Sequence, residues 1–240
     1  MSSQQTITRK SDIKPLIAAA QAHYAPGDPT ELANWCLSHI LCHRVKFPLL
    51  EYTAVQFSTF LPRQEQHTFI TALFGRAEHG SSVIIGKLLQ LWLPDDLSGA
   101  FDLASQTITS GDTWYHCDHI GERVYGHGLL TQTKEALPLL TNTLKNGDEW
   151  NQRAVGVAAH YSTKKGLEVE KVTAVLNLLL TRANTNSYEV QRGVGWGLKT
   201  IAKFHPDLMQ ATLGKLPPSA IATPIRRKIE TGLATAAKSR

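Results

Sequence analysis

Apolar residues recur at intervals of three and four positions along almost the whole chain, whereas strict apolar–polar alternation is scarce. The three-to-four spacing places apolar side chains on one face of an α-helix, and alternation is the pattern of a half-buried strand. We therefore predict an all-α protein. The predicted helices span residues 11–24, 29–44, 48–60, 64–78, 80–92, 95–108, 113–125, 133–145, 149–162, 168–183, 187–204, 206–214 and 223–237.

Polar residues at the expected helix starts support this division. Asp112 and Asp148 are suitable N-cap residues, and Asn186 with Glu189 has the spacing of a capping box. The connections are short, and no Gly/Ser-rich or Pro-rich linker interrupts the chain. We therefore expect one domain over residues 1–240.

Three tryptophans in the second half form a loose repeat. Trp114, Trp150 and Trp196 each lie near the start of a predicted helix, 36 and then 46 residues apart. Such a period is typical of HEAT-like helix pairs, which stack on one another because a single pair cannot bury its own apolar face. The pattern predicts a helical-repeat solenoid with a concave face that suits a long ligand.

Composition limits where in the cell the protein is expected. The first twelve residues are polar, and no apolar run approaches the roughly 18 residues of a membrane helix. The three cysteines show no disulfide pattern. We expect a cytoplasmic protein.

Charge is distributed unevenly along the chain. Residues 1–150 contain 11 Lys/Arg and 15 Asp/Glu, whereas residues 151–240 contain 14 Lys/Arg and 5 Asp/Glu. A basic half on such a chain indicates either a polyanion bound on one side or an ordinary solvated surface. The charge pattern alone favours neither.

The predicted helix 187–204 carries an unusual polar face. Arg192, Trp196, Lys199 and Lys203 fall in one narrow sector, opposite the large aliphatic residues. An indole surrounded by cations suits contact with an anionic chain and its sugars, although a tryptophan is more commonly buried.

Glycines at positions 193, 195 and 197 flank this indole. Each costs about 1 kcal/mol relative to alanine inside a helix. Close approach of a neighbouring helix, or of a ligand backbone, would explain them.

A carboxylate lies in the interior of the predicted helix 113–125. Trp114 and Asp118 are one turn apart and face the same way, with Tyr125 close to the same line. A carboxylate beside aromatic rings is partly desolvated, which favours a functional role over a capping one.

Arg153 shares a narrow polar sector of helix 149–162 with His160. A guanidinium can bind a phosphate through two parallel hydrogen bonds, and it can equally form a salt bridge with Asp118. Both alternatives are open at this point. The histidines and cysteines lack the paired spacing of a zinc site, so we expect no metal and no cofactor.

Several of these segments together resemble the AlkD-like DNA alkylation repair glycosylases. The resemblance covers residues 100–235, while residues 1–100 match poorly. Its motifs are Trp114-x-x-x-Asp118 followed by Gly126, the stretch 149–154, the stretch 191–206, and Arg226-Arg227-Lys228.

The resemblance implies a HEAT-like solenoid whose concave face grips duplex DNA, acting as a monomer without a metal ion. Such a protein would be associated with the nucleoid when it is bound to DNA. Asp118 would be the catalytic carboxylate, and Trp114 and Trp196 would hold the deoxyribose of the damaged nucleotide. The substrate would be a cationic N3- or N7-alkylated purine, excised without base flipping. The implied DNA-binding residues are Arg153, Arg192, Lys199, Lys203, Arg226, Arg227 and Lys228.

Two other functions share part of this pattern. A HEAT-like protein could bind damaged or distorted duplex DNA without excising a base, and it then differs only in whether Asp118 acts. A HEAT-type protein-interaction scaffold would show binding that depends little on salt, unlike duplex binding through several Lys and Arg side chains. Base release and salt dependence therefore separate the three functions.

Overall fold

The computed structural model describes residues 5–74 and 80–238, and nearly all of its regular structure is helical, which confirms the all-α prediction. The chain packs as two compact units, Met1–Trp92 and Leu93–Arg240. Each unit is described by itself, and the single domain expected over residues 1–240 stays a prediction. Part of the predicted helix 64–78, residues 75–78, lies outside the described residues.

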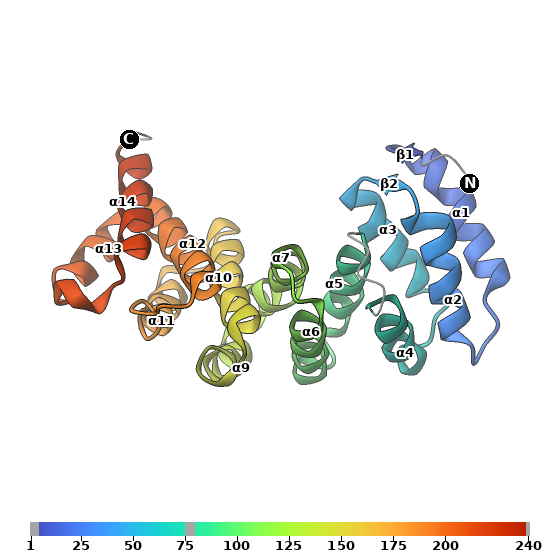
Figure 1. Cartoon of the computed structure of the whole chain (residues 1–240), viewed down its shortest axis with the longest axis horizontal. Helices are drawn as coiled ribbons and strands as arrows, with labels where there is room; N and C mark the ends of the chain where they lie inside the picture. The colour runs from blue at the N-terminus through green and yellow to red at the C-terminus, as the bar shows by residue number, and fades with distance from the viewer. Residues whose placement is uncertain (1–4, 75–79, 239–240) are drawn as a thin grey trace. The chain divides into compact units, whose positions relative to one another are not determined.

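The first unit consists of helices joined by short turns (Figure 1). Its elements are β1 Thr6–Ile7, α1 Lys10–His23, α2 Pro29–Cys36, the π-helix η1 Leu37–Leu41, β2 Arg44–Val45, α3 Phe47–Phe57, α4 Arg63–Phe74 and α5 Ser81–Trp92. The two strands pair in parallel over two residues each. Such strands are too short to show alternation, so the sequence pattern could not reveal them.

Aromatic rings fill the core of the first unit. Phe57 and Phe69 are fully buried, with ring centroids 5.7 Å apart. Trp92 ends α5 and donates from its indole Nε1 to Oε1 of the buried Gln66, at 2.7 Å. This bond satisfies two polar groups that would otherwise be buried without partners.

The second unit contains the predicted repeat region. Its elements are α6 Leu97–Gly111, α7 Trp114–Ile120, the π-helix η2 Gly121–Gly126, α8 His127–Thr131, α9 Thr133–Asn146, α10 Glu149–Lys164, α11 Val169–Leu180, α12 Tyr188–Phe204, α13 Pro206–Leu213, the 3₁₀ turn η3 Pro218–Ala220 and α14 Thr223–Lys238. In this unit α10 packs against both η2 and α12. Helix α12 in turn lies between α10 and α14 (Figure 1). One layer of neighbouring helices therefore runs from α7 through α10 and α12 to α14.

Helix α7 continues through η2 into α8, so the helical run reaches Thr131, six residues beyond its predicted end. Glycines in this stretch look like helix breakers in the sequence, but close packing accounts for them. A Cβ atom at Gly126 would lie 2.9 Å from the Tyr161 side chain, and one at Gly128 would lie 2.8 Å from the Phe101 ring.

The predicted helix caps are partly correct. Asp148 caps α10 by accepting a bond from the backbone N–H three residues later, at 2.8 Å. Asp112 does not cap α7. It ends α6 with a left-handed backbone (φ 43°) and accepts a bond from the Trp150 indole at 2.6 Å. Ser187, rather than Asn186, caps α12.

Helices α10 and α12 cross at glycines. A Cβ atom at Gly193 would overlap the carbonyl oxygen of Arg153, and one at Gly156 would overlap the backbone of Gly193. At Gly197 a Cβ would lie 2.8 Å from the Gly156 oxygen, and at Gly195 it would lie 2.7 Å from Cδ of Lys228. Close helix contact therefore explains Gly193 and Gly197, and Gly195 makes room for a lysine stem.

Among residues 5–74 and 80–238, none of the helices combines the length and apolar character needed to cross a membrane.

Candidate active site

A cavity of about 510 Å³ opens within the second unit, along the layer formed by α7, α10, α12 and α14. It is lined by Trp114, Asp118, Arg153, Tyr188, Glu189, Arg192, Trp196, Lys199 and Lys228. Seven of these nine were predicted as site residues from the sequence. The structure therefore brings side chains from four helices, over 100 residues apart in the chain, to one cavity.

Asp118 and Arg153 form a two-pronged ion pair across α7 and α10. Nε of Arg153 donates to Oδ1 of Asp118 at 2.9 Å, and Nη2 donates to Oδ2 at 2.8 Å. The Arg153 side chain is only 8% exposed and that of Asp118 is 14% exposed. The salt-bridge alternative for Arg153 is thus realised, and water screens this pair weakly.

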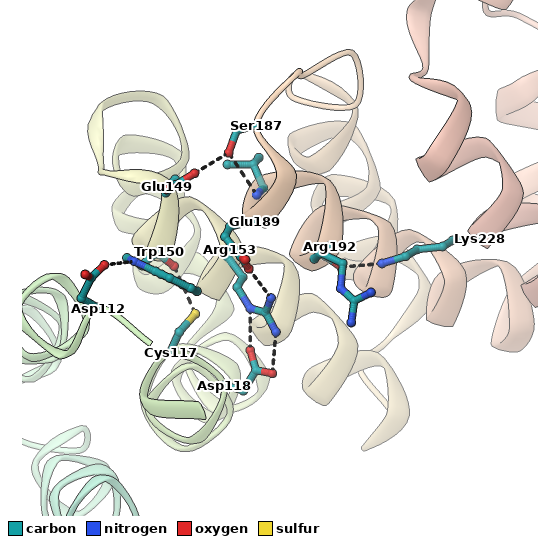
Figure 2. A network of polar contacts seen from close by, with 11 residues as sticks. Asp112, Cys117, Asp118, Glu149, Trp150, Arg153, Ser187, Glu189, Arg192 and Lys228 are labelled. Atoms are coloured by element: carbon teal, nitrogen blue, oxygen red, sulfur yellow. Dashed lines mark hydrogen bonds and ion pairs between the residues drawn. The ribbon is translucent and has the colours of Figure 1, made fainter. Parts of the chain in front are cut away.

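A second carboxylate shares the same guanidinium. Nη1 of Arg153 donates to Oε2 of Glu189 at 2.5 Å, and the Glu189 side chain is 18% exposed (Figure 2). Burial alone would lower the pKa of Arg153, but the hydrogen bonds and charge of Asp118, together with the hydrogen bond to Glu189, outweigh it and raise that pKa. One positive charge therefore stands between two negative ones.

Local sequence fixes the positions of these three groups. The close crossing at Gly193 brings the backbone of α12 against α10 at Arg153 itself. Ser187 caps α12 and donates from its hydroxyl to Glu149 at the start of α10, at 2.8 Å (Figure 2). The first turn of α12 is thereby tied to α10, and this places Glu189 opposite Arg153.

Trp196 is supported from one side by a histidine. The rings of Trp196 and His160 are stacked, with centroids 4.0 Å apart and planes 24° apart. His160 also contacts Oγ1 of Thr200 through Nδ1 at 2.7 Å. Burial, followed by the charges of Lys164 and Lys199, lowers the pKa of His160 to about 4, so its ring is neutral at pH 7. A neutral ring holds the indole at the cavity without adding charge.

Two aromatic side chains at the cavity are largely exposed. Trp114 is 57% exposed and Tyr188 is 65% exposed. The guanidinium carbon of Arg192 lies 5.7 Å from the centre of the Tyr188 ring. Exposed aromatic faces beside a cation are well suited to contact the sugars and phosphates of a ligand.

The cations of the cavity come from α12 and α14. Arg192 is exposed, whereas Lys199 and Lys228 are half-buried. Nζ of Lys228 donates to the carbonyl oxygen of Arg192 at 2.9 Å (Figure 2). Burial, followed by the positive charges of Arg192, Arg153 and Lys199, lowers the pKa of Lys228 to about 8.

Three of the predicted DNA-binding residues do not line the cavity. Lys203 is exposed near the end of α12, with Nζ 5.1 Å from the centre of the Phe204 ring. Arg226 is half-buried and Arg227 is exposed, both near the start of α14. Their proposed contact with DNA is therefore separate from the cavity.

Tyr125 was expected near the Trp114–Asp118 face, and this expectation is wrong. Its side chain is fully buried and donates from its hydroxyl to Oδ1 of Asn151 at 3.0 Å. The cause is the π-helical segment η2, because a wider turn rotates every later position relative to a regular α-helix.

Glu189 and Tyr188 are the two cavity residues that sequence reasoning missed. Glu189 was interpreted only as part of a capping box. It precedes Trp196 by seven residues, which is almost two full helical turns, so both lie on one face of α12. This spacing could have indicated that Glu189 shares the face of Trp196, but it could not show that Glu189 pairs with Arg153 on α10.

Comparison with known proteins identifies a family and a similar fold. Residues 16–231 match the family model described as DNA alkylation repair enzyme. The crystal structure of AlkD2 from Streptococcus mutans is similar in fold, with a TM-score of 0.69 at 14% sequence identity, over 85% of this chain and 97% of that one. No curated protein matches the chain.

The matched region begins at residue 16, so the family relationship extends well beyond the residues 100–235 inferred from motifs. The structural similarity also confirms the helical-repeat fold predicted from the tryptophan spacing. Because the family model covers most of the chain, the chain belongs to the DNA alkylation repair enzyme family.

Proposed function

We propose that this protein hydrolyses the N-glycosidic bond of cationic N3- or N7-alkylated purines in duplex DNA, without base flipping, as a cytoplasmic monomer. The observation that carries the proposal is the position of the Asp118 carboxylate at the cavity. This carboxylate lines the same cavity as the exposed indole of Trp114 and the half-buried indole of Trp196, and Arg153 holds it in place. Family membership supports DNA alkylation repair as the setting of this chemistry.

The chemistry requires little beyond a placed negative charge. An alkylated purine is already cationic and leaves as a neutral base, so no general acid is needed. The remaining sugar develops oxocarbenium character, which a carboxylate stabilises while it orients the attacking water. A charge pair 4 Å apart at an effective dielectric constant of 20 contributes about 4 kcal/mol, or about three decades in rate.

Arg153 leaves room for this role of Asp118. A carboxylate offers about four acceptor positions on its two oxygens. Arg153 uses one position on each oxygen. The remaining positions can bind the water that attacks the sugar, and the two-pronged pair fixes the plane of the carboxylate while it does so.

The other cavity residues suit the rest of the nucleotide. Trp114 and Trp196 can contact the sugar from two sides, and each indole face adds about 1–2 kcal/mol of cation–π stabilisation when it is desolvated. Arg192, Lys199 and Lys228 provide a row of positive charge for the phosphates on either side of the lesion.

Base release from methylated duplex DNA tests the proposal. We expect the protein to free 7-methylguanine or 3-methyladenine, and Asp118→Asn to remove most of that activity. Asp102→Asn is the matched control, because Asp102 is an exposed carboxylate on α6 away from the lining of this cavity. Wild-type rates from Asp118→Asn would exclude the proposed role of the carboxylate.

A second candidate function is binding of damaged duplex DNA without excision. The observation in its favour is that both oxygens of Asp118 accept bonds from Arg153, which offsets the charge of the carboxylate. This function predicts tight binding to methylated duplex without free base in the supernatant. The same assay therefore decides between the two.

A further inference from the structure

We propose that Glu189 sets the charge of this site and thereby makes the cavity select a cationic sugar. Because Glu189 and Asp118 share the single guanidinium of Arg153, the three side chains together carry a net charge of −1. Glu189 is a positioning residue in this account, because it acts through Arg153. The inference rests on the function proposed above for the same cavity and adds the basis of its selectivity for charged substrates.

The charge balance is the first step of the argument. One carboxylate joined to one guanidinium by two hydrogen bonds is neutral overall, and its field falls off as that of a dipole. Such a pair would stabilise a distant positive charge poorly. The bond from Nη1 of Arg153 to Glu189 adds a second negative charge to the same guanidinium. Asp118 then faces the cavity with its charge only partly cancelled.

Burial makes that residual charge effective. The side chains of Arg153, Asp118 and Glu189 are 8%, 14% and 18% exposed. Charges this far from water interact more strongly than surface pairs do, because the surrounding dielectric constant is lower. An unbalanced negative charge in this position is costly in the free protein, and a positive charge in the ligand would offset the cost.

Other cations of the cavity do not cancel this effect once DNA is bound. Arg192, Lys199 and Lys228 come from α12 and α14 and match the negative phosphates of a duplex. Their charges are then balanced by the backbone of the ligand. The cluster of Arg153, Asp118 and Glu189 remains as the local source of negative charge for the sugar.

A helix-capping role does not account for Glu189. The N-cap of α12 is Ser187, whose side chain accepts the bond from the backbone N–H of Val190. The Glu189 carboxylate instead points across to Arg153 on α10 (Figure 2). Glu189 is thus one of the residues that line the cavity. Its bond to Nη1 of Arg153 also limits rotation of the guanidinium relative to the Asp118 carboxylate.

Binding of two abasic analogues in duplex DNA tests the inference without requiring turnover. One duplex carries a neutral tetrahydrofuran residue, and the other carries a pyrrolidine residue that is protonated at neutral pH. We expect the wild type to prefer the cationic duplex. Glu189→Gln keeps an oxygen that accepts from Arg153 but removes the charge, and it should reduce the preference by about tenfold.

The neutral duplex serves as an internal control, because the proposal also predicts the direction in which Glu189→Gln changes the affinity for it. Removing a negative charge from a DNA-binding surface cannot weaken its attraction to phosphates, so Glu189→Gln should bind the tetrahydrofuran duplex as tightly as the wild type or more tightly. Glu189→Asp keeps the charge and should retain most of the cationic preference. Glu170→Gln is the matched control, because this exposed carboxylate in the first turn of α11 lies outside the cavity lining.

Three results would overturn the inference. These are a wild type without preference for the cationic duplex, an unchanged preference in Glu189→Gln, and equal weakening of both duplexes by that variant, which would indicate a purely structural role. Failure of the proposed function looks different. It would appear as a wild type that releases no base beyond spontaneous loss, or as base release that survives Asp118→Asn, whatever the binding preference.

Discussion

At the scale of single residues, Arg153 connects the parts of the site. Its three guanidinium nitrogens each donate to a carboxylate oxygen, two of them to Asp118 and one to Glu189. The side chain thus orients the carboxylate that we propose as catalytic and joins three helices. Sequence reasoning identified Arg153 as a site residue but left its partner open, because a helical pattern does not show which helices meet.

Removing Arg153 should destabilise the fold. Arg153→Ala would leave two largely buried carboxylates facing each other without a counter-charge. Loss of one partner from a buried pair costs about 3–5 kcal/mol, and the partial exposure of both acids reduces this to about 2 kcal/mol. The free energy of unfolding in urea measures the loss. Arg227→Ala, an exposed arginine on α14, should change that free energy little.

Lys228 should make DNA binding depend on pH. Its pKa is lowered to about 8, so the side chain is charged below that pH and neutral above it. Phosphates favour the charged form, and the affinity for duplex DNA should therefore fall as pH rises from 7 to 9. In Lys228→Met the same titration should be flatter. Parallel curves for the two proteins would show that Lys228 does not contact the phosphates.

At the scale of helices, apolar periodicity located most elements to within a few residues. The helix predicted over 187–204 is Tyr188–Phe204, and that over 149–162 is Glu149–Lys164. The π-helical segment Gly121–Gly126 was not predictable, because it depends on packing against α10. A Cβ at Gly121 would already lie 3.3 Å from that of Ala154. The buried position of Tyr125 follows from this segment and was missed with it.

The α10–α12 crossing offers a test of how helix packing positions the site. A Cβ at Gly193 would overlap the backbone carbonyl of Arg153, which cannot move aside as a flexible side chain can. Gly193→Ala should therefore lower the melting temperature and weaken DNA binding by displacing Arg153. Gly214→Ala is the control, since the nearest atom to its Cβ would be at 3.6 Å. Equal melting temperatures for both variants would contradict the packing account.

At the scale of the whole molecule, the acidic and basic halves of the sequence do not coincide with the two units of the structure. Residues 95–149 contain 9 Asp/Glu and only 3 Lys/Arg, and this stretch belongs to the second unit. Residues 1–92 contain 8 Lys/Arg and 6 Asp/Glu. The acidic surplus of the first half therefore lies mostly in the same unit as the site, and not in the amino-terminal unit.

Salt dependence follows from the cations of the cavity. Each phosphate contact contributes about −0.9 to the slope of log affinity against log salt for duplex DNA. Contacts from Arg192, Lys199 and Lys228 would give a slope of about −3 or steeper. Lys199→Gln should make that slope shallower by about one. Binding that is nearly independent of salt would instead favour a protein-interaction scaffold.

The most direct test of the central claim is a single-turnover rate of base release from a duplex with one N7-methylguanine. We expect the wild type to release the base faster than spontaneous loss. Asp118→Asn should be slower by up to about three decades, while still binding the duplex. A wild-type rate equal to spontaneous loss, or an Asp118→Asn rate equal to that of the wild type, would contradict the account.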